Sequence, residues 1–383
     1  MARLDEIFNL QMGKTPSRNN LEYWVDGKNC WVSIADLGTY QKFTSDTKEK
    51  ITDIAVCESG IKCVPENTVI MSFKLSLGKT AITKEPVYTN EAIMAFIPTG
   101  KFEVLPDYFY YVFSGRDWSK DTNRAVMGST LNKATLSEIS VDVPSLEEQQ
   151  KIAAVLDKVS DLIAKRRQQL EKLDLLVKAR FVEMFGNLKN NRNTTTTIEA
   201  ISEMVTVGIA NSATHAYDDK GVVLLRNQNI RENYLDDSDL IYITPDFANK
   251  YKSKALKKDD ILVTRTGYPG IACLVPNRYA GCQTFTTLIV RLKESIEILP
   301  LFVCCYINSD YGKTFVEEMK VGVAQQNFGA KALGKMPIFV PPIEDQIRFS
   351  AFVEQIEKTK TSVKECLTKL ETLKKSLMQE YFG

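Results

Sequence analysis

The chain has 383 residues, of which 44% are hydrophobic and 25% charged, and its formal net charge is +1. This composition is typical of a globular protein with two or more domains, and it excludes a polybasic chain that holds nucleic acid through bulk charge alone. No apolar run reaches the roughly 18 residues of a membrane helix, and the opening residues lack the basic flank and apolar stretch of a signal peptide, so we expect a cytoplasmic protein with no membrane partner.

Residues 1–142 combine short apolar runs with turn residues, the pattern of a mixed α/β domain. Two of its stretches, "MGKT" (12–15) and "LGKT" (77–80), end like a phosphate-binding loop. Such a loop needs a glycine five positions before its second glycine, and Phe8 and Phe73 stand there instead. An NTPase site is therefore not predicted.

Residues 143–186 have the pattern of one long helix, and Ser145 and Glu148 have the spacing of a capping box at its start. Apolar residues then recur in steps of three and four and form one stripe, with Arg166 as its charged interruption. The stripe comprises Ile152, Val155, Val159, Leu162, Leu170, Leu173, Val177, Phe181 and Met184. About 40 helical residues span roughly 60 Å, which is too long for burial in one small domain, so the stripe needs a partner.

Residues 187–339 start with a polar segment, "NNRNTTTT" (190–197), which we interpret as a linker, and then return to the mixed α/β pattern. A second long helix follows over residues 340–383, with Pro342 suited to its first turn. Its stripe includes Phe349, Phe352, Ile356, Val363, Leu367, Leu370, Leu373 and Leu377. We expect the two helices to pair as an antiparallel coiled coil that buries Ile152, Leu173, Phe352 and Leu370; pairing with another protein is the alternative.

The chain contains an internal repeat. Residues 143–186 align without a gap to residues 340–383, and 13 of the 44 positions are identical. The similarity continues weakly into the preceding domains, where "WVSIADL" (31–37) aligns with "LLRNQNI" (224–230) and Gly78 with Gly270. The sequence therefore predicts an α+β fold in which two similar α/β domains are joined by two long helices with pseudo-two-fold symmetry.

Catalytic and metal-binding motifs do not stand out. The eight cysteines form no C-x-x-C pair and His215 is the single histidine, so we expect buried reduced thiols and no zinc site. The chain lacks the N-P-P-[YF] and D-P-P-[YF] sequences of adenine methyltransferases, and no serine or cysteine lies in a recognisable nucleophile setting. We predict no cofactor and no enzymatic activity for the chain itself.

The repeated segments "VPSLEEQQKIAAVLD" (143–157) and "VPPIEDQIRFSAFVE" (340–354) resemble the conserved helical regions of type I restriction–modification specificity subunits. "GKTPSR" followed by "WVSIADL" resembles the opening of a target-recognition domain in that family. "AQQNFGAKALGKMPIFVPPIEDQ" (324–346) resembles its closing segment and is echoed by "MGSTLNKATLSEISVDVPSLEEQ" (127–149). The second domain departs from the family, because "VGIANSAT" (207–214) stands where a "GKTPSR"-like opening is expected.

The resemblance covers the whole chain and implies a DNA-binding subunit that is not an enzyme. It implies that each globular domain reads one half of a bipartite double-stranded DNA target and that the helices set the spacing. It also implies two adenine-methyltransferase subunits and restriction subunits, which translocate and cut DNA, as partners. The competing interpretations are a coiled-coil scaffold without a DNA role and a self-contained methyltransferase.

Candidate DNA-contacting residues follow from side-chain chemistry. Arginine pairs with guanine, and asparagine or glutamine with adenine, through two hydrogen bonds in the major groove, whereas lysine and threonine more often hold phosphates. The candidates are Lys14, Thr15, Arg18, Lys74 and Lys79 in the first domain, and Arg226, Asn227, Gln228, Asn229, Arg265, Thr266, Gln325 and Gln326 in the second. The alternative is that Gln325, Gln326 and Asn327 cap turns and that most of these arginines are solvated.

Overall fold

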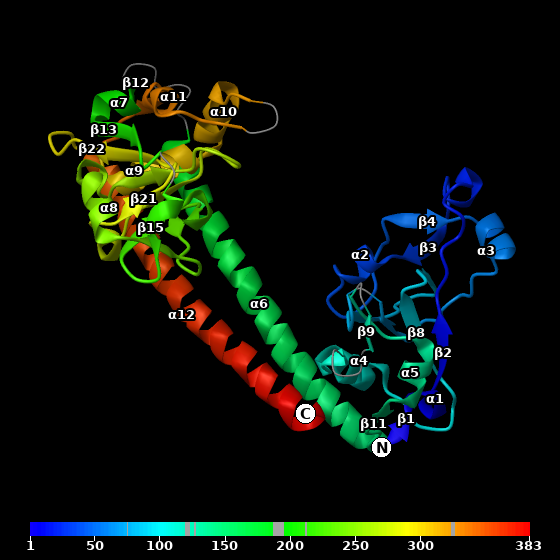
Figure 1. The fold of residues 1–383 in the computed structure, drawn as a ribbon. Helices are drawn as coiled ribbons and strands as arrows, with labels where there is room; N and C mark the ends of the chain where they lie inside the picture. Colours follow the sequence, from blue (N-terminus) through cyan, green and yellow to red (C-terminus); the bar gives the residue numbers. More distant parts are fainter. Residues whose placement is uncertain (75, 119–122, 126–127, 187–194, 211–212, 323–325) are drawn as a thin grey trace. The chain divides into compact units, whose positions relative to one another are not determined.

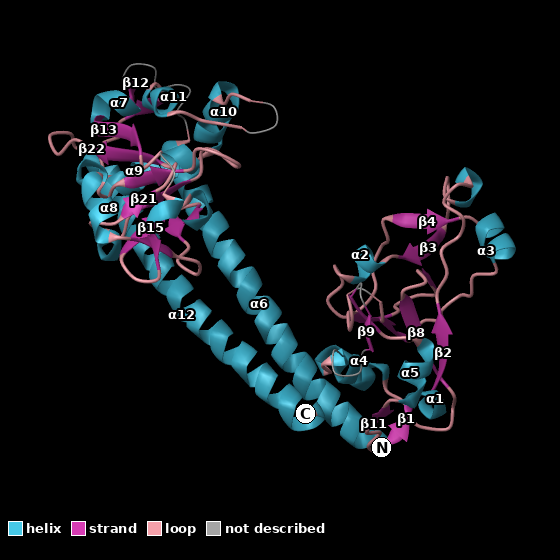
Figure 2. Cartoon of the chain, viewed as in Figure 1, coloured by secondary structure: helices cyan, strands magenta, loops and turns pink. Residues whose placement is uncertain are grey.

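The computed structural model describes all of the chain except residues 75, 119–122, 126–127, 187–194, 211–212 and 323–325. The chain divides into two compact units, of which unit 1 comprises residues 1–167 and 365–383 and unit 2 comprises residues 168–364. Two 40-residue helices, α6 (Leu146–Phe185) and α12 (Ile343–Phe382), each contribute one end to either unit. Both units combine helices and strands (Figure 2).

Unit 1 is built on an antiparallel four-stranded sheet of order β2-β8-β5-β6 and a three-stranded sheet of order β4-β3-β7, in which β3 and β7 are parallel. Its elements are β1 (Ala2–Arg3), α1 (Leu4–Ile7), β2 (Phe8–Met12), η1 (Leu21–Tyr23), β3 (Asn29–Val32), α2 (Ile34–Leu37), β4 (Glu49–Ile51), α3 (Asp53–Ser59), β5 (Val69–Ser72), β6 (Thr80–Ile82), β7 (Tyr88–Thr89), β8 (Ile93–Pro98), α4 (Pro106–Gly115), β9 (Asn123–Ala125), β10 (Gly128–Thr130), α5 (Lys133–Glu138) and β11 (Ser140–Val141). Strand β1 pairs with β11, so the two ends of the domain meet before α6 begins.

Unit 2 repeats this topology, with a four-stranded sheet of order β13-β22-β19-β20 and a second sheet of order β14-β18-β15-β21, in which β15 and β21 are parallel. Its elements are β12 (Thr195–Thr197), α7 (Ile198–Ile201), β13 (Ser202–Val207), η4 (Thr214–Ala216), β14 (Tyr217–Asp218), β15 (Val222–Leu225), η5 (Asn227–Asn229), β16 (Ile230–Arg231), β17 (Tyr234–Leu235), β18 (Ile241–Ile243), α8 (Pro245–Lys250), η6 (Lys252–Lys254), β19 (Ile261–Val263), β20 (Ala272–Leu274), η7 (Asn277–Tyr279), β21 (Gln283–Thr284), β22 (Leu288–Leu292), α9 (Pro300–Asn308), α10 (Asp310–Met319), α11 (Ala330–Gly334) and β23 (Pro337–Phe339). Strands β12 and β23 pair as β1 and β11 do. The matching strand orders confirm that the repeat extends through both globular domains.

The hydrophobic core of each unit joins its main sheet to the long helices through one short helix. In unit 1 this helix is α4, and the ring of its Tyr108 contacts that of Phe382 with centroids 5.6 Å apart. In unit 2 it is α9, and its Phe302 contacts Phe185 at 5.0 Å. Because Phe382 and Phe185 are equivalent positions of the two repeated helices, α4 and α9 are equivalent in packing as well as in sequence.

A fully buried glutamine at the start of each long helix holds the preceding domain in place. Gln149 accepts a hydrogen bond from the Leu105 amide (2.9 Å), and its amide nitrogen donates to the carbonyls of Glu103 and Pro144 (both 2.9 Å). Gln346 does the same in unit 2, where it accepts from Leu299 (2.7 Å) and donates to the carbonyls of Glu297 (3.2 Å) and Pro341 (2.8 Å). We refer to these two contact sets as the glutamine clamps.

Within unit 2 the long helices run antiparallel and side by side (Figure 1). Asp174 of α6 pairs with Lys360 of α12 at 2.7 Å, and further along α6 the ring of Phe181 lies 5.5 Å from that of Phe349, which precedes Lys360. Within unit 1, Arg167 bonds Glu371 at 2.7 Å.

The apolar stripe is less buried than the sequence predicts. Ile152 is buried as expected, but Leu173, Phe352 and Leu370 are only half-buried. The buried side chains of α6 are instead Ile152, Ala153, Leu156, Val159, Ile163, Val177, Phe181 and Phe185, with Gln149 among the polar residues. Burial is concentrated where a helix faces its domain, because two helices alone cannot cover each other on all apolar positions.

Three cysteines are buried, as the sequence predicts for reduced thiols. Cys273, Cys304 and Cys305 are buried, and burial raises the thiol pKa of Cys273 and Cys305 to about 12. Cys57 and Cys63 are exposed, however, so the expectation of buried thiols fails at these two positions.

None of the helices in the described part of the chain has both the length and the apolar character of a membrane span.

Replacement of Ile152 by alanine should lower the free energy of unfolding by about 2–5 kcal/mol, because a buried side chain leaves a cavity. Leu370→Ala should cost less, since solvent already reaches that position. Chemical denaturation of both variants measures the difference, and an equal loss would contradict the burial described above.

Gln346→Ala should lower the free energy of unfolding of unit 2 by about 1–3 kcal/mol, because the Leu299 amide is left buried without an acceptor. Gln355→Ala, at an exposed position of the same helix, is the matched control. Amide hydrogen exchange should show faster exchange at Leu299 in the first variant only.

Candidate nucleic-acid interface

The loop after β15 in unit 2 places two candidate side chains on one carboxylate. The Arg226 backbone amide donates to Asn229 Oδ1 (2.9 Å), which starts a tight turn at the end of the strand. The Arg226 guanidinium then donates through Nη2 to Asp239 Oδ2 (2.9 Å), and Gln228 Nε2 donates to the same oxygen (2.5 Å). Asp239 therefore orients both side chains at once.

The hairpin between β19 and β20 connects to this loop through Asn227. Its side-chain amide donates to Thr266 Oγ1 (2.9 Å) and accepts from the Arg265 backbone amide (3.1 Å). Arg265 Nε donates in turn to Asn327 Oδ1 (3.1 Å), a contact that does not use the two terminal nitrogens of the guanidinium. Three stretches far apart in the sequence, near residues 226–229, 265–266 and 327, thus form one polar network.

Two candidates of this set serve the fold. Asn229 is almost fully buried, and its amide nitrogen bonds the carbonyls of Asp236 (3.0 Å) and Asp239 (2.9 Å), so its side chain presents no surface to DNA. Gln326 is half-buried, and its side-chain oxygen accepts a hydrogen bond from the Lys320 ammonium (3.0 Å), so this side chain already has a partner within unit 2. Gln325 lies outside the described residues.

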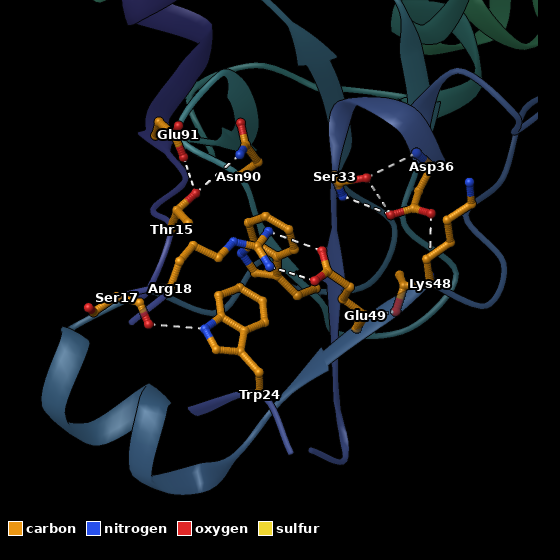
Figure 3. A network of polar contacts seen from close by, with 12 residues as sticks. Thr15, Ser17, Arg18, Trp24, Ser33, Asp36, Lys48, Glu49, Asn90 and Glu91 are labelled. Atoms are coloured by element: carbon orange, nitrogen blue, oxygen red, sulfur yellow. Dashed lines mark hydrogen bonds and ion pairs between the residues drawn. The ribbon is translucent and has the colours of Figure 1, made fainter. Parts of the chain in front are cut away.

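Arg18 in unit 1 is held by aromatic rings and a carboxylate (Figure 3). Its guanidinium carbon lies 3.8 Å from the ring centroid of Trp24 and 4.9 Å from that of Trp31, and both terminal nitrogens bond the carboxylate of Glu49. The indole of Trp24 donates to the Ser17 carbonyl (3.1 Å) and the indole of Trp31 to that of Lys14 (3.1 Å). The segment around Arg18 is therefore fixed before any ligand arrives.

Lys14 and Thr15 also have partners within unit 1. The Lys14 ammonium donates to the Ser59 carbonyl, and the Thr15 hydroxyl donates to Glu91. Thr15 Oγ1 accepts from Asn90 Nδ2 (3.1 Å; Figure 3). Phosphate binding by these two side chains would have to displace existing contacts.

Lys74 and Lys79 lie on the β5–β6 hairpin, which has the same pattern of hydrogen bonds as the β19–β20 hairpin. The Ser72 hydroxyl donates to the Ser76 carbonyl and accepts from the Lys79 amide (3.0 Å). Thr264 makes the same two contacts, with the Tyr268 carbonyl (2.7 Å) and the Ile271 amide (2.9 Å). Lys79 is exposed and Lys74 half-buried, and Lys79 is therefore the better placed of the two for a phosphate.

Sequence reasoning missed the carboxylates Glu49 and Asp239, which hold the predicted arginines. The acidic run "LDDSDL" (235–240) soon after Arg226 is the signal that could have indicated the second of them. It also missed Tyr268, whose side chain is 85% exposed at the tip of the β19–β20 hairpin beside Arg265 and Thr266.

The family model of the type I restriction modification DNA specificity domain matches residues 1–173 and again residues 193–373. The chain belongs to this family. The two matches place one specificity domain around each of the polar networks described above, together with most of the long helix that follows it.

Curated relatives are named as specificity subunits. The chain is 34% identical over 191 residues to the type I restriction enzyme MjaIX specificity subunit of Methanocaldococcus jannaschii. This alignment covers 49% of this chain and 43% of that protein. It is 30% identical over 168 residues to the EcoR124I/EcoR124II specificity subunit of Escherichia coli, covering 42% of this chain and 40% of that one. The matches thus span less than half the length of these two relatives.

Solved structures of the family share the fold. The S subunit of a type I restriction-modification system from M. genitalium has a TM-score of 0.57 at 14% identity, with coverage of 100% of this chain and 95% of that one. A structure from a study of complex assembly and conformational transition of the type I R-M system has a TM-score of 0.63 at 14% identity, with coverage of 100% and 96%. At these identities the likeness concerns the specificity-subunit fold.

Asn227→Ala should uncouple the loop after β15 from the β19–β20 hairpin, because it removes hydrogen bonds to both Thr266 and Arg265. Each lost bond should cost about 0.5–1.5 kcal/mol of unfolding free energy, and the Arg265 amide should exchange its hydrogen faster. Gln228→Ala is the exposed control in the same turn. Unchanged exchange at Arg265 in the Asn227 variant would contradict the described network.

Proposed function

We propose that this chain is the DNA-recognition subunit of a type I restriction–modification complex and that its two specificity domains each read one half of a bipartite target. In this proposal residues 1–142 and 187–339 are the two readers. The helical segments 143–186 and 340–383 fix the spacing between the half-sites and carry docking faces for two methyltransferase subunits, with which restriction subunits assemble. The chain is non-catalytic and acts in the cytoplasm.

The observation that carries the proposal is the polar network of unit 2, built on a scaffold that unit 1 repeats with other side chains. Arg226 to Asn229 follow β15 as Ser33 to Asp36 follow β3. In both turns the backbone amide of the first residue donates to a side-chain oxygen of the fourth, Asn229 Oδ1 at 2.9 Å and Asp36 Oδ2 at 3.0 Å. A shared backbone with different polar side chains is what two readers of different half-sites require. The family match supports this assignment over a scaffold without a DNA role.

Arg265 is the strongest base-reading candidate of the set. Asn327 fixes its Nε, so the two terminal nitrogens lie at a defined place where they can donate to two acceptors on a guanine edge. Arg226 differs, because its Nη2 already bonds Asp239 and its Nε is buried without a hydrogen-bond partner among the described residues. Lys79, exposed directly before β6 in unit 1, suits a phosphate.

Arg265→Ala should therefore change base preference in one half of the target only, with a loss of about 1–3 kcal/mol of discrimination at one position. Lys79→Ala should weaken binding to all sequences and reduce the slope of log affinity against log salt by about one. Binding or methylation motifs fitted on a randomised DNA library with the assembled complex measure both effects. Arg348→Ala, at an exposed arginine of α12, is the matched control.

Two separate readers and one joint DNA-binding surface lead to different expectations for a substitution in unit 2. A substitution in unit 2 must leave the half-site read by unit 1 unchanged. If Arg265→Ala reshaped both half-sites together, the domains would be reading DNA as one surface and the proposal would fail.

A further inference from the structure

Unit 2 contains a cleft of about 620 Å³ where the loop before β17 faces α9, α6 and α12. Its apolar part includes Val177, Leu299 and Val353, and its polar part includes Glu232 and Glu354. All of these residues belong to unit 2. The internal repeat allows a direct comparison with the same place in unit 1.

Helix α4 is equivalent to α9, and α6 is equivalent to α12. Tyr108 and Phe302 are equivalent because each contacts the phenylalanine that ends its long helix. Three positions further along, Tyr111 of α4 is equivalent to Cys305 of α9. On the long helices, Asp157 is equivalent to Glu354, as the gapless alignment of the two segments requires.

In unit 1 this place is filled by the chain's own side chains. The buried Tyr111 donates its hydroxyl hydrogen to Asp157 Oδ1 (2.7 Å). The Lys42 ammonium lies 2.5 Å from the same oxygen and 2.5 Å from Asp107, and 5.3 Å from the Tyr111 ring centroid. A carboxylate on the long helix thus receives one phenol and one cation.

In unit 2 both donors are gone. The Cys305 thiol donates to Asn233 Oδ1 (3.5 Å), and the loop before β17 contributes a carboxylate, Glu232, to the cleft wall. Glu232 pairs with Lys178 of α6 (2.5 Å) and with Lys313 of α10. Burial would raise the pKa of Glu232, but the hydrogen bonds from these two lysines outweigh it and lower the pKa.

In the described part of the chain, the other carboxylates that face α6 and α12 on the cleft wall have a cationic partner, and Glu354 does not. Lys360 pairs with Asp174 and Glu357, both at 2.7 Å. Glu354 is exposed on the cleft wall, and among the described residues no cation pairs with it. The Ser350 hydroxyl on the same wall is buried and has no hydrogen-bond partner among those residues either.

We propose that this cleft binds a lysine or arginine side chain of the methyltransferase subunit, with Glu354 as its acceptor. The inference rests on the proposed function, because it takes the methyltransferase as the partner. The aliphatic stem of such a side chain would cover the apolar wall while its charge meets Glu354, as long basic side chains do at mixed surfaces. The cation takes the place that Lys42 occupies in unit 1.

A consequence is that the two docking places for methyltransferase subunits are not equivalent. In unit 1 the side chains of Tyr111 and Lys42 fill the place that corresponds to the cleft, whereas in unit 2 the cleft is open to a partner. The subunit bound at unit 2 therefore gains an anchor that the other lacks.

Two substitutions test the cleft in the complex of the full chain with its methyltransferase. Glu354→Gln removes the acceptor charge. Cys305→Tyr introduces into the cleft the phenol that Tyr111 provides at the equivalent position of unit 1. Each should weaken binding of one of the two methyltransferase subunits by roughly 10- to 100-fold, the range for a lost hydrogen bond to a charged group. Glu344→Gln, an exposed glutamate of α12 outside the cleft, should bind both subunits as the unmodified chain does.

Sedimentation and calorimetric titration give the stoichiometry and the two affinities, and thermal unfolding reports whether each variant is folded. Wild-type affinity in both Glu354→Gln and Cys305→Tyr, beside an intact wild-type complex, overturns the inference alone. Absence of any complex with the unmodified chain overturns the proposed function and the inference with it. DNA selectivity of the assembled Glu354→Gln complex should be unchanged, since the cleft lies outside the polar network.

Discussion

The glutamine clamps are the contacts on which the rest of each unit depends. In the proposed function each domain reads DNA from the end of a long helix, which requires a fixed orientation of the domain to that helix. Gln149 and Gln346 fix it, because each fully buried side-chain amide bonds one backbone amide and two backbone carbonyls. Because an unpaired buried polar group is costly, neither domain can tilt away from its helix without breaking several hydrogen bonds at once.

With the attachment held constant, the exposed loops are free to diverge. The turn after the central strand keeps its hydrogen bond in both copies, yet it carries Ser33 and Asp36 in one and Arg226 and Asn229 in the other. The hairpin tip keeps its hydroxyl contacts and changes from Ser76 to Tyr268. A duplicated chain can thus present two different surfaces on one backbone, which a homodimer with identical half-sites cannot do.

The sequence predicts what depends on local pattern and on the repeat. The two long helices and the equivalence of the domains follow from periodicity and alignment. The burial of individual helix positions does not, because it depends on which face meets a domain, and Leu173 and Phe352 are half-buried for that reason. Glu49 and Asp239 also escape prediction, since each meets its arginine through folding of residues that are 31 and 13 positions apart.

If Arg18 and Arg226 contact bases, as the proposed function requires of some polar side chains in each domain, their pairing with carboxylates determines how they discriminate between bases. Arg18 already bonds Glu49 with both terminal nitrogens, and Arg226 bonds Asp239. A base edge that engages either arginine must replace contacts of similar strength, so the exchange contributes little to affinity. A wrong base cannot complete the exchange and leaves a carboxylate facing DNA, which is unfavourable. Paired arginines therefore favour specificity over affinity. With a net charge of only +1, the chain has little surplus charge for phosphates, and the proposed partner subunits would have to supply much of the attraction to DNA.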